Sequence, residues 1–466
     1  MSAPAQADRF RRNRPFAVVA ALIILVAAVV GVILVHRYSG SPGASFTGSL
    51  SSTSSLGGAT TTTITSNLTT ATCSSSTTTI TSLSTMSISN STSLCSFEIA
   101  ATNLGGDLDN PILDSNTGII YGFSSTQPNL NTLLTAINTS SLAARTVLTL
   151  PGTGLGIAVD AKTDAVYVLI LGCVEGVQVP NTCGSNPSGF VDQEILRVNG
   201  STGAIEGKIP IQTNGSFIGI DPNTDTLYST QTCPHANPPC GRLLAFNATT
   251  GSLAQNLTVK AGLGGLVVNP VTGMVYAQGG WELPAPQSGD NRTQGIVAFR
   301  NPAPSLQVAF EVPLSYTNTI DLSMDESTNV VYGFADNIVG NESSNNLVAI
   351  NGATGSVLFA KVVGTCSLAD AAGPEGATVN TSTNQVYLDT TQGEATLVAL
   401  DGTTGQVVGS LPSPSLIDNS LFDSQSGRLF VFLEGGGVAV IPSAVIEGGV
   451  NPAILNPSCP IVLPLG

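Results

Sequence analysis

Residues 267–280 read "VVNPVTGMVYAQGG", from Val267 to Gly280, and contain two short apolar runs around a polar turn. The first run ends at Asn269-Pro270, and the second begins after Thr272-Gly273. Apolar runs of this length, separated by turn-forming residues, predict a β-hairpin. The same sequence motif, which we call the repeated phrase, recurs along the chain, and this recurrence indicates the fold.

The phrase occurs seven times after residue 97, each time with Asp or Asn at its head and an aromatic residue on the returning run. The head and aromatic pairs are Asp114 and Tyr121, Asp160 and Tyr167, Asp221 and Tyr228, Asn269 and Tyr276, Asp325 and Tyr332, Asn380 and Tyr387, and Asp423 and Phe430. Successive aromatic positions are 46, 61, 48, 56, 55 and 43 residues apart. That period is typical of a four-stranded blade with variable loops. A second phrase, such as "NLVAINGATGSVLFAKVV" from Asn346, interleaves with the first and supplies the other hairpin of each blade.

The residue types in the phrase have a local structural reason. Asp or Asn at the head of a turn can accept hydrogen bonds from backbone amides two and three residues later. Gly, Asn or Asp later in the turn tolerates a positive φ. The aromatic residue starts the return strand and is expected to be buried between neighbouring blades. We therefore interpret the seven acidic or amide heads as turn caps rather than as calcium ligands.

These phrases resemble the YVTN-repeat family of β-propellers, which is common in archaeal and bacterial surface proteins. The resemblance covers residues from about 97 to the C-terminus and implies an all-β, seven-bladed β-propeller over residues 97–466. The chain departs from the family after the tyrosine, where Val-Thr-Asn is replaced by Val-Leu-Ile after Tyr167 and by Ala-Gln-Gly after Tyr276. The family has no shared catalytic residues, so the resemblance implies no active site.

The ring is expected to be closed by the N-terminal end of the repeat region. The last phrase is followed by too few strands to complete a blade, whereas "FEIAATNL" from Phe97 to Leu104 precedes the first phrase. We expect this strand to complete the seventh blade and so remove the open edges. The tail strand "IVLPL", residues 461–465, is the alternative.

The N-terminus predicts a membrane anchor. Four arginines at positions 9, 11, 12 and 14 precede the segment 15–35, which carries no charge. A helix of that length spans roughly 30 Å, the thickness of the hydrocarbon core. The arginine cluster places residues 1–14 in the cytoplasm and the rest of the chain outside the cell. A cleaved signal peptide is the alternative, although its apolar run is usually shorter.

The segment 36–96 is predicted to be a stalk. Ser and Thr make up 34 of the 57 residues from Ser39 to Cys95, and no charged residue lies between Arg37 and Glu98. Such a segment has too few apolar groups to offset the entropy cost of ordering, and a glycosylated stalk is one function for it. The repeated "TTTITS" at 61–66 and 77–82 favours extended structure, so strand exchange with a neighbour is the alternative.

The eight cysteines predict disulfides, because the chain is expected to lie outside the cell. The pairs Cys173–Cys183 and Cys233–Cys240 are close in sequence and lie between strands. Of the remaining Cys73, Cys95, Cys366 and Cys459, we favour a Cys95–Cys459 bond, which would lock the closing strand to the tail. The segment "CPHANPPC" contains His235, but zinc prefers four ligands, so a disulfide loop is the preferred interpretation.

Ten Asn-x-Ser/Thr sequons predict glycosylation on an outer surface that is short of charge. They are Asn67, Asn90, Asn138, Asn199, Asn214, Asn247, Asn256, Asn291, Asn341 and Asn380.

The net charge and the motifs of the chain limit the classes of function that are expected for it. From Tyr38 onward, ten basic and 29 acidic residues give a net charge of −19, which would repel nucleic acid. The sequence contains no sialidase box, no tryptophan docking repeat and no c-type haem motif, so we expect no catalytic residue, cofactor or metal. The leading hypothesis is a membrane-anchored, glycosylated surface module that binds envelope proteins or glycans. The alternatives are a self-assembling filament or surface-layer subunit, with self-association through the stalk, and an extracellular enzyme with its site in the channel.

Overall fold

The computed structural model describes residues 86–90, 93–100, 106–126, 131–150, 152–172, 193–211, 215–233, 240–282, 292–301, 305–316, 320–339, 342–367, 377–390, 396–412, 417–434, 436–443 and 446. All of them lie in one compact unit, Thr65–Gly466. These residues form 29 strands arranged in seven sheets. The expected transmembrane segment 15–35 and most of the expected stalk lie outside the described residues. Within the described part, no helix is long and apolar enough to cross a membrane.

The first six sheets, which we call blades 1 to 6, each contain four strands that are consecutive in the chain and are ordered from the innermost to the outermost. Blade 1 contains β3 (Leu108–Asp114), β4 (Ile119–Thr126), β5 (Asn131–Asn138) and β6 (Ala144–Thr149). Blade 2 contains β7 (Gly152–Asp160), β8 (Ala165–Gly172), β9 (Gln193–Asn199) and β10 (Ile205–Ile211). Blade 3 contains β11 (Gly215–Asp221), β12 (Thr226–Thr232), β13 (Gly241–Asn247) and β14 (Leu253–Val259).

Blades 4 to 6 repeat this order. Blade 4 contains β15 (Gly262–Asn269), β16 (Met274–Glu282), β17 (Arg292–Arg300) and β18 (Gln307–Tyr316). Blade 5 contains β19 (Ile320–Asp325), β20 (Val330–Val339), β21 (Glu342–Asn351) and β22 (Val357–Ser367). Blade 6 contains β23 (Ala377–Asn380), β24 (Gln385–Thr390), β25 (Thr396–Asp401) and β26 (Val407–Pro412).

Blade 7 combines both ends of the repeat region. Its inner strands are β27 (Ile417–Asp423), β28 (Arg428–Leu433) and β29 (Gly437–Pro442), and its fourth strand is β2 (Ser93–Ala100). β2 pairs with β29 through Glu98–Val440, Ile99–Ala439 and Ala100–Val438, so the prediction that the N-terminal strand closes the ring is confirmed. β2 also pairs with β1 (Met86–Asn90). The first strand that the structure describes thus begins at Met86, inside the segment that the sequence assigns to the stalk.

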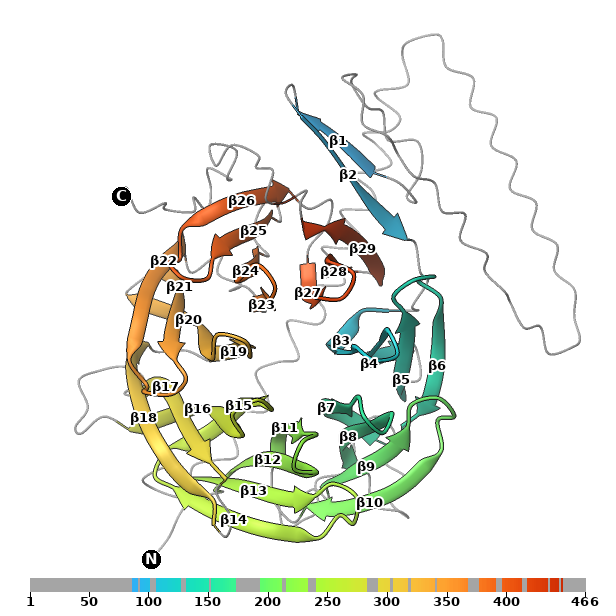
Figure 1. Cartoon of the computed structure of the whole chain (residues 1–466), viewed down its shortest axis with the longest axis vertical. Helices are drawn as coiled ribbons and strands as arrows, with labels where there is room; N and C mark the ends of the chain where they lie inside the picture. Colours follow the sequence, from blue (N-terminus) through green and yellow to red (C-terminus); the bar gives the residue numbers. More distant parts are fainter. Residues whose placement is uncertain are drawn as a thin grey trace, which may run out of the picture. The chain divides into compact units, whose positions relative to one another are not determined.

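The seven sheets form a closed ring of blades (Figure 1). Each innermost strand contacts the innermost strand of the next blade, and β27 contacts β3. Seven separate apolar clusters fill the seven blade–blade interfaces. The predicted all-β, seven-bladed β-propeller is therefore confirmed.

The aromatic residue of the repeated phrase is the third residue of the second strand in every blade. In six blades it is the tyrosine named above, and in blade 7 it is Phe430. All seven side chains are at most 1% exposed. Each belongs to the cluster that its blade shares with the next blade, as Tyr121 does in the interface between blades 1 and 2. The prediction of equivalent, buried aromatic positions is confirmed.

Candidate functional site

The two faces of the ring are different. Because neighbouring strands are antiparallel, the turns between first and second strands and between third and fourth strands lie on one face, which we call the turn face. The connections between second and third strands and between successive blades lie on the other, which we call the loop face. A side chain that holds the ring together is not free to bind a partner. The face with fewer such contacts is therefore the candidate functional surface.

The seven Asp or Asn heads of the repeated phrase cap the first turn of each blade. Each is at most 6% exposed, and each accepts a hydrogen bond at its Oδ1 from the amide nitrogen two residues later. These N···O distances are 2.8–3.0 Å in all seven blades. In the described residues, no group of three or more His, Cys, Asp or Glu side chains could hold a metal ion. The seven hydrogen bonds from the backbone amides confirm that these residues are turn caps.

The last residue of each of these turns has a positive φ, between 53° and 67°. The seven residues are Gly118, Asp164, Asp225, Gly273, Asn329, Asn384 and Gly427. Only Gly, Asn and Asp occupy the position, because other side chains are strained in the left-handed region. This predicted feature is also confirmed.

Hydroxyl groups of buried tyrosines bond to turn residues of the next blade. The Tyr276 hydroxyl of blade 4 donates to the Gly352 carbonyl of blade 5 at 2.8 Å and lies 3.1 Å from Asn329 Oδ1. The Tyr167 hydroxyl of blade 2 donates to the Ala248 carbonyl of blade 3 at 3.1 Å. Burial raises the pKa of both hydroxyls to about 12. These side chains therefore act as neutral locks between blades rather than as acids or bases near neutral pH.

A second set of bonds runs around the turn face. The residue two positions after the capping head donates to the carbonyl one position after the head of the next blade. Asn116 Nδ2 lies 2.6 Å from the Ala161 oxygen, Lys162 Nζ 3.0 Å from Pro222, and Asn223 Nδ2 2.6 Å from Pro270. The equivalent residue of blade 4 is Val271, whose side chain cannot donate a hydrogen bond and which is 72% exposed. The turn face is thus largely committed to blade–blade contacts.

The loop face contains the variation. Measured from the buried aromatic residue, the second strand reaches Leu433 in blade 7, three residues past Phe430. In blade 4 it reaches Glu282, six residues past Tyr276, and in blade 5 it reaches Val339, seven residues past Tyr332. At roughly 3.3 Å per residue, blades 4 and 5 rise about 10 Å or more above blade 7. They form one raised side of an uneven rim.

The only tryptophan of the chain, Trp281, lies on this raised rim. It is partly buried against the cluster between blades 3 and 4. A Cβ on Gly279 would come within 2.6 Å of its ring, and one on Gly295 within 2.9 Å, so the indole covers two paired glycines of β16 and β17. The repeated motifs do not include Trp281, so they do not predict it as a loop-face feature. The adjacent Gly279-Gly280 was the signal, because bare glycines in a strand leave room for a neighbouring aromatic ring.

The innermost strands carry acidic residues near their loop-face ends. Among their described residues there is no Lys, Arg or His, whereas Asp109, Asp321 and Asp418 lie towards the loop face. The pKa of Asp109 is raised by burial and by the nearby Asp107. Five of these strands contain a register shift, for example between Asp109 and Ile112. Such bulges re-aim side chains at the rim of a sheet.

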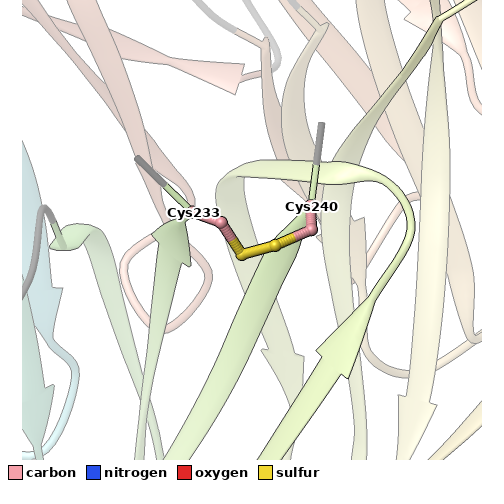
Figure 2. Close-up of a disulfide and its surroundings, with 2 residues drawn as sticks. All are labelled: Cys233 and Cys240. Carbon is pink, nitrogen blue, oxygen red and sulfur yellow. A yellow bond between two sulfur atoms is a disulfide. The ribbon is translucent and has the colours of Figure 1, made fainter. Parts of the chain in front are cut away.

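The structure contains a disulfide between Cys233 and Cys240 (Figure 2). Their Cα atoms are 5.2 Å apart, and the Cys233 amide donates to the Cys240 carbonyl at 2.8 Å. The pair joins the ends of β12 and β13 on the loop face. Cys95 lies in β2 and Cys366 in β22, whereas Cys73, Cys173, Cys183, Cys459 and His235 lie outside the described residues.

The predicted glycosylation sites occupy different environments. Asn256 is exposed on the outermost strand β14. Asn138, Asn199 and Asn247 are half-buried and cap the turns between third and fourth strands through their Oδ1 atoms. Asn90 ends β1. Asn67, Asn214, Asn291 and Asn341 lie outside the described residues.

Asn380 differs from the other members of this set. Its side chain is 1% exposed, and its Oδ1 accepts bonds from the Ser382 amide at 3.0 Å and the Ser382 hydroxyl at 2.6 Å. It is one of the seven heads of the first turn, so a sugar on its amide nitrogen would have no route to solvent in this fold. Its sequon arises because a capping Asn is followed by Thr381 and Ser382.

Comparison with known proteins identifies the fold but no family. No family model matches the chain, and no curated protein matches its sequence. Among solved structures, Kuenenia stuttgartiensis hydrazine synthase is 12% identical, with a TM-score of 0.53 and coverage of 74% of this chain and 97% of that one. The β-propeller domain of Cps50 (Swd1) from Myceliophteria thermophila is 8% identical, with a TM-score of 0.50 and coverage of 74% and 99%. Likenesses at this identity are evidence for the propeller fold, while membership of the YVTN-repeat family stays a prediction.

Proposed function

We propose that this chain is a cell-surface β-propeller that binds other envelope proteins or glycans through its loop face and is not a catalyst. The supporting observation is the contrast between the two faces. The residues repeated in every blade are used as turn caps and blade–blade locks on the turn face. The loop face, in contrast, differs from blade to blade in its rim height, and it contains the disulfide and the single tryptophan. A partner that binds there would meet features that distinguish this chain.

The side-chain chemistry also supports a binding role. In the described residues, the groups with a raised pKa are five blade-interface tyrosines together with Asp109 and Glu326. For Glu326, burial is the main cause and the neighbouring Asp325 adds to it. The tyrosine hydroxyls bond to turn residues of the next blade, as Tyr276 does to Gly352, which is a structural role. A binding module requires only a rigid frame and a distinctive surface.

The membrane attachment and the family of the chain are proposed from its sequence. We propose that residues 15–35 anchor the chain as a single span with residues 1–14 in the cytoplasm, and that a Ser/Thr-rich, glycosylated stalk carries a YVTN-repeat propeller outside the cell. Mass spectrometry of the mature N-terminus tests the anchor. A mature chain that begins near residue 40 would contradict it.

The loop-face assignment has a matched test. Arg242, at the loop-face end of β13, and Arg300, at the turn-face end of β17, are both exposed. Full-length Arg242→Glu and Arg300→Glu chains would be cross-linked in native envelopes, and their partners identified by mass spectrometry. We expect Arg242→Glu to lose the wild-type partner and Arg300→Glu to retain it. Loss with Arg300→Glu alone, or equal loss with both, would overturn the assignment.

Fluorescence gives an independent readout. Because Trp281 is the only tryptophan and lies on the loop-face rim, its emission should shift when the identified partner is titrated into the full chain. A partner that binds without changing this emission, while Arg300→Glu abolishes binding, would place the site on the turn face.

A further inference from the structure

The N-terminal hairpin lies almost entirely beyond blade 7. β2 pairs with β1 from Ser93 to Phe97, and with β29 only from Glu98 to Ala100. No residue of β2 is therefore hydrogen-bonded on both sides. We call residues 86–90 and 93–97 the N-terminal arm. It is a two-stranded ribbon that continues from the fourth strand of the blade, and no other strand of the described residues pairs with it.

Pro442 explains why the pairing with β29 stops. In the register set by Glu98 and Val440, Ser96 would oppose Pro442, the last residue of β29. Proline has no N–H to donate to a sheet. Within the part of the chain that the structure describes, the arm consequently has two open strand edges, one along β1 and one along Ser93–Phe97. A lone two-stranded ribbon is marginally stable in water, so additional pairing would stabilise it.

The arm also lacks the usual protection of an open edge. Charged residues or prolines normally prevent edge strands from pairing with other chains. The sequence has no charged residue from Tyr38 to Phe97, and the arm, "MSISN" and "SLCSF", has no proline. The chain from Tyr38 onward has a net charge of −19, which opposes contact between two rings. The arm itself carries no charge, so two arms can approach each other without adding to this repulsion.

We infer that the arm pairs with the arm of a second copy of this chain, through antiparallel hydrogen bonds along the open edge of β1. A two-fold axis brings identical edges together in antiparallel orientation and makes the contact self-complementary. The inference does not depend on the loop-face function. It assigns the self-association that the Ser/Thr-rich region predicts to one particular strand edge.

The register identifies the backbone groups involved. Asn90 pairs with Ser93 across a connection of two residues, and such a closing pair is hydrogen-bonded. Hydrogen-bonded and non-hydrogen-bonded pairs alternate along an antiparallel ribbon. The N–H groups of Ser87 and Ser89 therefore point to the open edge, whereas that of Ile88 bonds within the arm.

The test compares full-length chains by sedimentation in mild detergent from about 1 to 100 μM, the range in which a modest interface associates. We expect the wild type and the control Ser87→Ala/Ser89→Ala to shift from one to two copies as concentration rises. Ser87→Pro/Ser89→Pro, which removes the two open N–H groups, should remain at one copy. Ser87→Lys/Ser89→Lys should do the same, even though the added lysines reduce the net negative charge and hence the repulsion between copies.

Circular dichroism and thermal unfolding of each variant check that the ring is intact. Hydrogen exchange provides the second readout. The Ser87 and Ser89 amides should be protected at high concentration and lose at least tenfold in protection on dilution. A wild-type chain that stays monomeric, or proline variants that associate like the wild type, would overturn the inference. Protection that is independent of dilution would also overturn it, since it would show pairing within one chain.

Discussion

The Tyr332 hydroxyl of blade 5 donates to the backbone carbonyl of Gly402 in blade 6 across 3.0 Å. It also lies 3.1 Å from Asn384 Oδ1. A Cβ at position 402 would come within 2.4 Å of this hydroxyl, so the glycine is required by the tyrosine of another blade. The tyrosine of blade 5 thus contacts two turns of blade 6. Asn384 lies in the turn between the first and second strands, and Gly402 lies in the turn between the third and fourth strands.

Replacing Tyr332 by Phe should therefore destabilise the propeller. The change keeps the buried ring and leaves the Gly402 carbonyl and the Asn384 amide oxygen without the hydroxyl. We expect a loss of about 1–2 kcal/mol in the free energy of unfolding, measured by urea denaturation. Tyr121→Phe is the control, because its bond to Asp164 is 3.4 Å long. Equal losses in the two variants would contradict this role for the hydroxyl.

The same tyrosines predict alkaline sensitivity. Burial raises the pKa of Tyr167 and Tyr276 to about 12, against about 10 in an unfolded chain. Between these values the unfolded chain binds fewer protons than the folded chain, so stability falls as pH rises. We expect it to be constant from pH 7 to near 10 and then to fall by roughly 1.4 kcal/mol per unit for each such tyrosine. Urea titrations at several pH values, with tyrosinate absorbance, measure this loss, and a midpoint that is unchanged from pH 10 to 12 would contradict it.

The fold could be predicted from the sequence because each blade is specified locally. The capping residue, the positive-φ position and the aromatic residue lie within eight residues of one another, as in Asn269, Gly273 and Tyr276. Their spacing needs no knowledge of the rest of the chain. The partner of the tyrosine hydroxyl could not be predicted, because Gly352 lies in the next blade and is 76 residues away in the sequence.

The functional surface was less predictable for the same reason. Asn380 and Asn138 have similar sequons but different environments. Asn380 caps the turn between the first and second strands and is buried, whereas Asn138 caps the turn between the third and fourth strands and is half-buried. The N-terminal arm has the composition of the stalk, so only the segment from Phe97 onward could be assigned to blade 7 from the sequence. The rim height of blades 4 and 5 depends on where strand pairing ends, which the loops' composition does not reveal.

Val271 offers a stabilising substitution. It is 72% exposed and occupies the position at which Asn116 and Asn223 donate to the next blade. In Val271→Asn the new amide should reach the Glu326 carbonyl and extend the hydrogen-bonded ring between blades 4 and 5. We expect a gain of about 0.5–1 kcal/mol in the free energy of unfolding. Val271→Ala removes the exposed apolar group without adding a donor, so an equal gain in that variant would contradict the mechanism.

Glycan occupancy should follow burial. Asn256 is exposed on β14, so we expect it to be modified in the native protein, and Asn380 to be unmodified because a sugar there would prevent its turn from closing. Glycopeptide mass spectrometry of the chain from its own cells measures both sites. Substantial occupancy at Asn380 would show that the turn is open in part of the population.

The Cys233–Cys240 disulfide should stabilise the loop face without being needed for the ring. The cysteines are separated by seven positions, and closing so short a loop is worth about 2 kcal/mol. The bond lies at the end of one hairpin, outside the blade–blade clusters. We therefore expect Cys233→Ser/Cys240→Ser to fold, with a loss of about 2 kcal/mol in urea titrations. Reduction of the wild type should cause the same loss of stability. The variant lacks this cysteine pair, so reductant should not lower its stability through this bond.

Zinc is the control, because His235 lies between the two cysteines. If zinc restored the stability of the reduced wild type, the pair would be a metal site, whereas restoration by oxidation alone would identify the disulfide as the stabilising form.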